Sequence, residues 1–194
     1  LMDTFENEIY PTDREFFGSE WTPGVDEDPH IFVVYAGGLG GNIAGYFNSS
    51  DSFNPQVKEF SNAHETYMLS TTQDLANDFT YGVLAHEFVH MIQFPSDRND
   101  VSWISEGFAD VGMFLNGYGV GNHDWVYVQD PDLQLNTWGG ASDDNAPHYG
   151  QSFLYLTYFL DRFGKEATQA LTNNPENSLP SVDDTLAQLG ITDP

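Results

Sequence analysis

The sequence predicts an α+β fold, in which strands come early in the chain and helices come late. Short runs of β-branched and aromatic residues, separated by glycine-rich and polar turns, lie between residues 31 and 70. From about residue 74 onward, apolar residues recur instead at the spacing of a helix. The chain has 194 residues, is 40% hydrophobic and shows no repeat or clear linker. We therefore expect a single domain over residues 1–194, in which residues 1–95 form a sheet and the main helix and residues 96–194 are mainly helical.

The first part of the chain is predicted to contain one helix and three short strands. Residues 3–17 carry apolar side chains at helical spacing but include Pro11, so we expect a helix that is broken or restarted there. The run Ile31–Tyr35 is apolar throughout and is predicted to be a buried strand. The glycine-rich turn at residues 37–41 fits neither the dinucleotide fingerprint nor the P-loop, so we interpret it as a flexible loop. The other two strands are expected at residues 43–47 and 65–70.

The second part is predicted to be helical, with one long irregular stretch at residues 118–147, which are rich in Gly, Asp and Asn. Apolar stripes, closed by proline or glycine, define three helices. Two short helices are expected after them. The longer helices are expected at residues 74–95, 102–115 and 149–163, and the short ones from near Lys165 and from a cap at Ser181 with Asp184.

The charge is strongly negative, because 5 Lys and Arg stand against 30 Asp and Glu, which gives −25. Such a surface repels nucleic acid and disfavours anionic membranes. The sequence contains no apolar run long enough to insert in a membrane. Three explanations of the acidity stay open: a solvated, self-repelling surface, adaptation to high salt, and calcium-binding loops. The calcium candidates are residues 26–28 and 130–132, although neither matches the EF-hand pattern.

Cysteine is absent from the chain, which excludes disulfides, a thiol nucleophile and any metal site built from thiolates. A metal ion would have to be held by histidine and carboxylate side chains, a combination that suits catalytic zinc. No signal-peptide pattern is present. We interpret a chain that opens with Leu1-Met2-Asp3 as a processed or trimmed piece.

The strongest motif is His86-Glu87-Phe88-Val89-His90, which lies inside the first long predicted helix. Residues four apart share a helix face, so His86 and His90 can converge on one metal ion. Glu87 is turned by about 100° from His86 and stands beside the metal, where a base can take a proton from water. The alternative is a pair of surface histidines on an amphipathic helix, but the apolar neighbours argue against it.

A catalytic zinc with two helical histidines needs a third protein ligand, and the next predicted helix offers Glu106. Glu106 lies 16 residues after His90 and among apolar residues, where an unpaired carboxylate is costly. Asp110 follows one helical turn later and faces the same way. We expect Asp110 to accept a hydrogen bond from a ligand histidine, the alternative being a solvated carboxylate at the helix end.

The His-Glu-x-x-His segment at residues 86–90, followed by Glu-Gly-x-Ala-Asp at residues 106–110, resembles the gluzincin zinc metallopeptidases. It is most similar to the hyicolysin-like branch, which carries a Trp-x-x-Glu-Gly-x-Ala segment, here residues 103–109. The thermolysin family likewise places an Asp four residues after its ligand Glu. The metzincin alternative needs a further His and Gly shortly after the motif, whereas this chain continues with Gln93-Phe94-Pro95-Ser96.

The resemblance implies a zincin-like fold and a zinc endopeptidase that cleaves peptides or proteins through a metal-activated water. Zinc would be held by His86, His90 and Glu106. The resemblance also implies a Tyr or His that hydrogen-bonds the oxyanion, for which Tyr149 is preferred and His148 is the rival. We expect the strand at residues 43–47 to hold the peptide by backbone pairing, and we expect the protein to be secreted or on the cell surface.

Two other functions stay open at this point. One is a catalytically silent interaction or surface-layer module that keeps a metal for structure, although Glu87 argues against it because a structural site has no use for a base. The other is a metal hydrolase with a substrate that is not a peptide. The remaining histidines, His30, His64 and His123, are expected to be surface or turn residues.

Overall fold

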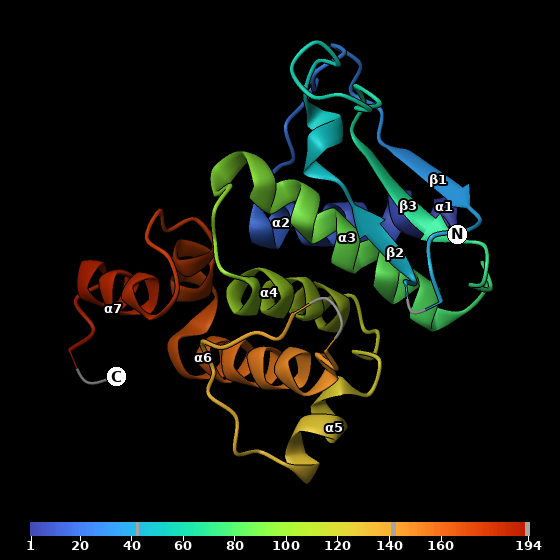
Figure 1. The fold of residues 1–194 in the computed structure, drawn as a ribbon. Coiled ribbons are helices and arrows are strands. Elements are labelled where there is room, and N and C mark those ends of the chain that lie inside the picture. Colours follow the sequence, from blue (N-terminus) through green and yellow to red (C-terminus); the bar gives the residue numbers. More distant parts are fainter. Residues whose placement is uncertain (42, 141–142, 193–194) are drawn as a thin grey trace.

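The α+β class is confirmed by the computed structural model, which describes residues 1–41, 43–140 and 143–192. A three-stranded sheet lies at one end of the molecule, and the long helices follow it one after another (Figure 1). The elements are α1 (Met2–Thr4), a π-helical turn (Phe5–Ile9), α2 (Tyr10–Phe17), β1 (Phe32–Ala36), β2 (Gly45–Phe47), a 3-10 turn (Ser49–Ser52), β3 (Thr66–Ser70), α3 (Asp78–Ser96), α4 (Ser102–Leu115), α5 (His123–Gln129), α6 (Ala146–Thr172) and α7 (Leu179–Gln188).

The sheet has the order β1-β3-β2, with β1 parallel and β2 antiparallel to β3. The prediction that β1 is a buried strand is wrong. Its Phe32, Val34 and Tyr35 are 39–44% exposed, whereas Tyr67 and Leu69 of β3 are fully buried. The physical reason is position: β1 is an edge strand, and an apolar run does not distinguish an edge strand from a central one.

The N-terminal helical segment runs from Met2 to Phe17, and the restart predicted at Pro11 is confirmed: α2 begins at Tyr10, with Pro11 in its first turn. Proline removes a backbone donor, and its ring clashes with the carbonyl four residues earlier in a regular α-helix. Here the helix widens to a π-helical turn at Phe5–Ile9, which ends two residues before Pro11, and the Tyr10 N–H donates a hydrogen bond to the Phe5 carbonyl. The change of helix type accommodates the proline.

The helices stack in layers below the sheet (Figure 1). Helix α3 contacts β2 and β3, α4 packs against α3, and α6 packs against α4. The flanking helices α5 and α7 both contact α6, and α2 lies against α3. One hydrophobic cluster runs through these layers and includes side chains from Phe5 near the N-terminus to Leu186 in α7. This stacking sets α3 between the sheet and α4.

The bounds of α4 agree with the prediction, and the other helices differ from it at their ends. Helix α3 begins at Asp78, because the Asn77 side chain caps it by accepting a hydrogen bond from the Phe79 N–H at 2.8 Å. Helix α6 begins at Ala146, three residues earlier than predicted, but it leaves helical geometry at Gly164, where φ is 84°, and continues beyond it. The predicted end at Gly164 and the further helix from Lys165 are therefore confirmed. Helix α7 begins at Leu179, so the predicted cap at Ser181 with Asp184 is wrong.

Helix α5 lies in the stretch that was predicted to be irregular, whose residues 141–142 are outside the described residues. It has seven residues and no buried side chain, and its apolar residues stand in one continuous run, Trp125–Val128, which does not have the spacing of a helix. Its packing on α6 supplies the contacts instead. In the described part of the chain, every helix is too short or too polar to traverse a lipid bilayer.

Candidate metal centre

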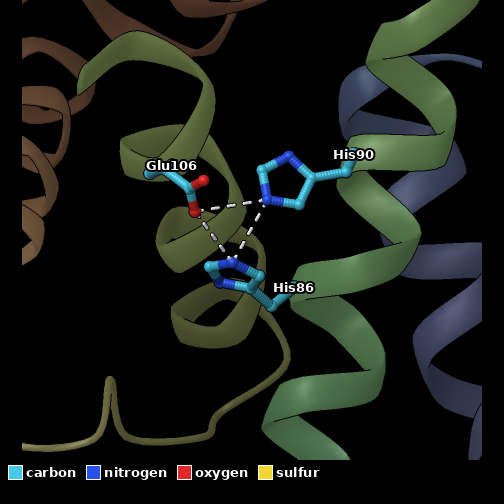
Figure 2. Close-up of side chains that lie close together, drawn as sticks. All are labelled: His86, His90 and Glu106. Carbon is cyan, nitrogen blue, oxygen red and sulfur yellow. Dashed lines mark hydrogen bonds and ion pairs between the residues drawn. The ribbon is translucent and has the colours of Figure 1, made fainter. Parts of the chain in front are cut away.

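Three predicted ligands meet at one point between α3 and α4. His86 and His90 project from α3 and Glu106 projects from α4, with their polar atoms facing one another (Figure 2). The His86 Nε2 atom lies 3.2 Å from His90 Nε2 and 3.2 Å from Glu106 Oε2. His90 Nε2 lies 3.3 Å from the same carboxylate oxygen. The three ligand atoms form a nearly equilateral triangle.

The size of this triangle fits a small tetrahedral metal ion. Ligands at the corners of a tetrahedron around zinc, with bonds of about 2.0–2.1 Å, lie about 3.3–3.4 Å from one another. The observed separations of 3.2, 3.2 and 3.3 Å are close to these edges. Two imidazoles and one carboxylate are also the donor types that zinc accepts. The group can therefore hold a metal ion.

The outer ring nitrogens support this interpretation. His86 Nδ1 lies 3.0 Å from Asp110 Oδ1, and His90 Nδ1 lies 3.2 Å from the Ser105 hydroxyl, which in turn lies 3.5 Å from Gln93 Oε1. When both Nδ1 atoms donate to these oxygens, both Nε2 atoms keep their lone pairs. Three electron-rich atoms then face one point, an arrangement that a cation stabilises.

The electrostatics at this point favour positive charge. Burial by itself would raise the pKa of Glu106, but the neighbouring His90 and His86 rings outweigh it and hold that pKa well below its usual range. Burial lowers the pKa of His86, yet the hydrogen bonds to Asp110 and Glu106 raise it well above its usual range. Both shifts have the sign expected where a cation is stabilised by nearby carboxylates.

Glu87 lies beside the triad and is held by the sheet. Its side chain is buried, with 7% of the residue exposed, and its Oε2 atom accepts a hydrogen bond from the Phe47 N–H of β2 at 2.7 Å. Burial raises the pKa of Glu87, and the nearby His86 and His90 partly counteract this. The second oxygen, Oε1, remains for a partner in the cleft, so the residue has one fixed atom and one that can react.

The triad and Glu87 line a cleft of about 360 Å³ between β2, α3, α4 and the start of α6. Tyr149, in the first turn of α6, lines this cleft, and its ring centre lies 6.3 Å from that of His86. Burial, and secondarily the negative charge of Glu106, raise the pKa of Tyr149. His148 lies instead against Trp138, with ring centres 5.7 Å apart, and is not among the residues that line the cleft. The structure thus places Tyr149, and not His148, beside the predicted ligands.

Three contributors to the site were not found from the sequence. The Phe47 N–H is a backbone group, and no sequence pattern marks it. Ser105 stands next to Glu106, yet its contact with His90 depends on how α4 crosses α3. His123 was expected on the surface, but its Nδ1 atom lies 3.6 Å from the buried Asp110 Oδ2. The only feature of the sequence that marks this position is the Gly121-Asn122 pair before His123, which is typical of a turn with left-handed backbone angles.

The calcium candidates do not gather as a ligand cage in the described residues. Asp26 pairs with His64 and Asp28 pairs with His30, so two of these carboxylates have partners inside the protein. Residues 130–132 are exposed. Within residues 1–41, 43–140 and 143–192, the only group of three or more side chains placed to hold a metal is His86, His90 and Glu106.

Comparison with known proteins gives no family for this chain. No protein-family model matches it, and no curated protein matches it. The functional argument therefore rests on the residues of the cleft and their geometry.

Proposed function

We propose that this protein is a zinc-dependent endopeptidase of the gluzincin type with a zincin-like fold. The observation that carries the proposal is a triad of metal ligands with a separate, buried glutamate beside it in one open cleft. Structural zinc sites are closed by four protein ligands, whereas catalytic sites use three and leave a position for water or substrate. The described residues supply three. Glu87 supplies the base that a purely structural site does not need.

The side chains of the cleft have separable roles in this proposal. A bound zinc ion supplies Lewis-acid polarisation of the scissile carbonyl and of water. Glu87 Oε1 accepts a proton from the attacking water and delivers it to the leaving amine, while the Phe47 N–H keeps Oε2 in place. Tyr149 stays protonated because its pKa is raised, and its hydroxyl donates to the carbonyl oxygen as negative charge develops there.

Strand β2 is the element that we expect to bind the peptide. It is an edge strand next to β3, and Gly45, Tyr46 and Phe47 all line the cleft. The Phe47 N–H points away from β3, because it reaches Glu87 in α3. Since backbone groups two residues apart point to the same side of a strand, Gly45 presents its N–H and C=O along this edge. An extended peptide that pairs with Gly45 lies across the cleft.

Digestion of an unfolded protein tests the function directly. We expect purified protein to bind about one zinc per chain and to cleave internal peptide bonds, to stop when a chelator removes the metal, and to resume when zinc is restored. Stoichiometric zinc without any cleavage would favour a silent binding module. Turnover of small esters but not of peptides would favour a hydrolase of another class.

A further inference from the structure

The carboxylate of Asp110 forms a hydrogen bond through only one of its two oxygens in the described residues. Its side chain is almost fully buried, with 1% of the residue exposed. Oδ1 binds His86 Nδ1 at 3.0 Å, whereas Oδ2 has no hydrogen-bond partner among the described residues. A buried carboxylate oxygen without a donor is costly, and native proteins rarely keep one without a function.

The nearest complementary group is the imidazole of His123. Its Nδ1 atom lies 3.6 Å from Asp110 Oδ2 and is itself buried without a hydrogen-bond partner in the described part of the chain. One atom is an acceptor and the other becomes a donor when it carries the ring proton. The same ring packs beside Tyr149, with ring centres 5.0 Å apart. A shift of a few tenths of an ångström pairs the two unsatisfied atoms.

The backbone around His123 is shaped to hold it in this place. Gly121 and Asn122, which precede it, both have left-handed backbone angles, with φ of 62° and 69°. Such a conformation is uncommon for a residue with a side chain and is found mostly where the surrounding structure imposes it. On the opposite side, a Cβ atom added to Gly150 of α6 would lie 2.0 Å from the His123 carbonyl oxygen. The start of α5 therefore sits directly on α6, next to Tyr149.

We infer that His123 is a positioning residue of the metal centre, an inference that rests on the proposed function. Its Nδ1–H donates to Asp110 Oδ2, so that the carboxylate is held at both oxygens. A carboxylate fixed in this way holds His86 in the tautomer that directs Nε2 to the metal. The His123 ring also supports Tyr149 at the edge of the cleft. His123 is neither one of the three candidate metal ligands nor among the residues that line the cleft.

Zinc affinity, measured by competition with a chromophoric chelator, tests the inference without any substrate. His123→Phe keeps a ring beside Tyr149 and removes the donor, and it should bind zinc about 10- to 100-fold more weakly than wild type. His123→Asn keeps a donor near the position of Nδ1 and should restore affinity to within about threefold of wild type, on the same outer-shell reasoning. His30→Phe, at a histidine whose side chain is 79% exposed, is the matched control and should bind zinc as wild type does.

Wild-type affinity in His123→Phe, or an equal loss in His123→Asn, would overturn the inference. If the variants do not fold, imidazole ¹⁵N spectra of the wild-type zinc protein decide: Nδ1 of His123 should carry the proton, and an unprotonated Nδ1 would count against the proposal. A zinc protein that shows the expected affinities but cleaves no peptide would refute only the proposed function. A wild type without zinc affinity would refute both.

Discussion

Glu87 and Glu106 are the same residue type in one cleft, and their pKa values shift in opposite directions. Burial raises the pKa of Glu87, whereas the two histidine rings hold that of Glu106 low. Such a division between neighbouring carboxylates separates a proton acceptor from a permanent anion. At the residue scale, the surroundings of each glutamate therefore decide its proposed role.

Replacing Glu87 with Gln tests this division. Glu87→Gln keeps the shape and an acceptor for the Phe47 N–H but removes the base. We expect peptide cleavage to fall by about 10²–10⁴, while zinc content, measured by atomic absorption, stays at the wild-type value. Cleavage at the wild-type rate would remove Glu87 from the mechanism.

Tyr149 is expected to act on the transition state more than on the bound substrate. Tyr149→Phe keeps the ring beside His86 and His123 and deletes one donor. We expect kcat to fall by about 10²–10³ with a smaller change in KM, and zinc content and melting temperature to stay unchanged. His148→Ala is the neighbouring control, and a fully active Tyr149→Phe beside a crippled His148→Ala would reverse the assignment.

Asp13 lies in α2, away from the cleft, and we expect it to make the stability of the protein depend on pH. It is fully buried, its Oδ1 accepts a hydrogen bond from Asn116 at 2.7 Å, and its Oδ2 has no partner among the described residues. Burial raises the pKa of Asp13 well above its usual value. The protonated form thus contributes stability that is complete below the unfolded-state pKa of about 3.9 and is lost as the pH rises through the folded-state pKa.

Asp13→Asn copies the protonated acid at every pH. The variant should therefore melt at a higher temperature than wild type near neutral pH, and the difference should shrink as the pH approaches about 4. Thermal melts of both proteins across this range measure the effect. A difference that does not depend on pH would show that Asp13 is not the titrating group.

At the scale of elements, the site depends on how closely β2 approaches β3 and α3. At Gly45 there is no room for a side chain: an added Cβ atom would be 2.8 Å from the Met68 carbonyl oxygen and 2.8 Å from Val83 Cγ1. The Met68 oxygen is backbone in the central strand and cannot turn away. Any side chain at Gly45 must therefore displace β2, whose Phe47 N–H holds Glu87.

Gly45→Ala should consequently reduce both stability and activity. We expect a loss of about 1–3 kcal/mol in the free energy of unfolding, measured by denaturant titration, and a clear fall in peptide cleavage. Gly41→Ala is the matched control, because a Cβ atom there has open space around it, and its stability should stay within about 0.5 kcal/mol of wild type. If Gly45→Ala and Gly41→Ala change stability and peptide cleavage equally, the close packing of β2 on β3 and α3 is not needed for the site.

At the scale of the whole molecule, the charge of −25 is hardly compensated. Among the lysines and arginines of the described residues, only Arg14 and Lys165 form ion pairs with carboxylates. Arg98 and Arg162 lie over aromatic rings instead. The net charge therefore acts mainly as self-repulsion, which weakens the folded state at low ionic strength.

We expect the melting temperature to rise from low salt to molar KCl, because the screening length falls from about 10 Å at 0.1 M to about 3 Å at 1 M. Melts in KCl and in millimolar calcium at matched ionic strength make the comparison. Stabilisation by calcium alone would favour calcium-binding loops, despite the histidine partners of Asp26 and Asp28. If neither KCl nor calcium changes the melting temperature, the acidic residues form a solvated surface whose repulsion does not weaken the fold.

The spacing of residues within single helices was sufficient to predict much of the candidate site. His86, Glu87 and His90 stand on one helix, so their relative directions follow from its period. The same holds for Glu106 and Asp110 one turn apart, and the bounds predicted for α4 agree with the structure.

Only the tertiary structure decided what depends on packing between elements. It placed Tyr149 in the cleft and His148 against Trp138, set the Phe47 N–H on Glu87, and brought His123 to Asp110. The physical reason is the separation of these residues in the sequence. The period of a helix fixes the relative directions of side chains within one element. These contacts join residues from different elements, so their positions depend on how the sheet, α3, α4, α5 and α6 pack together.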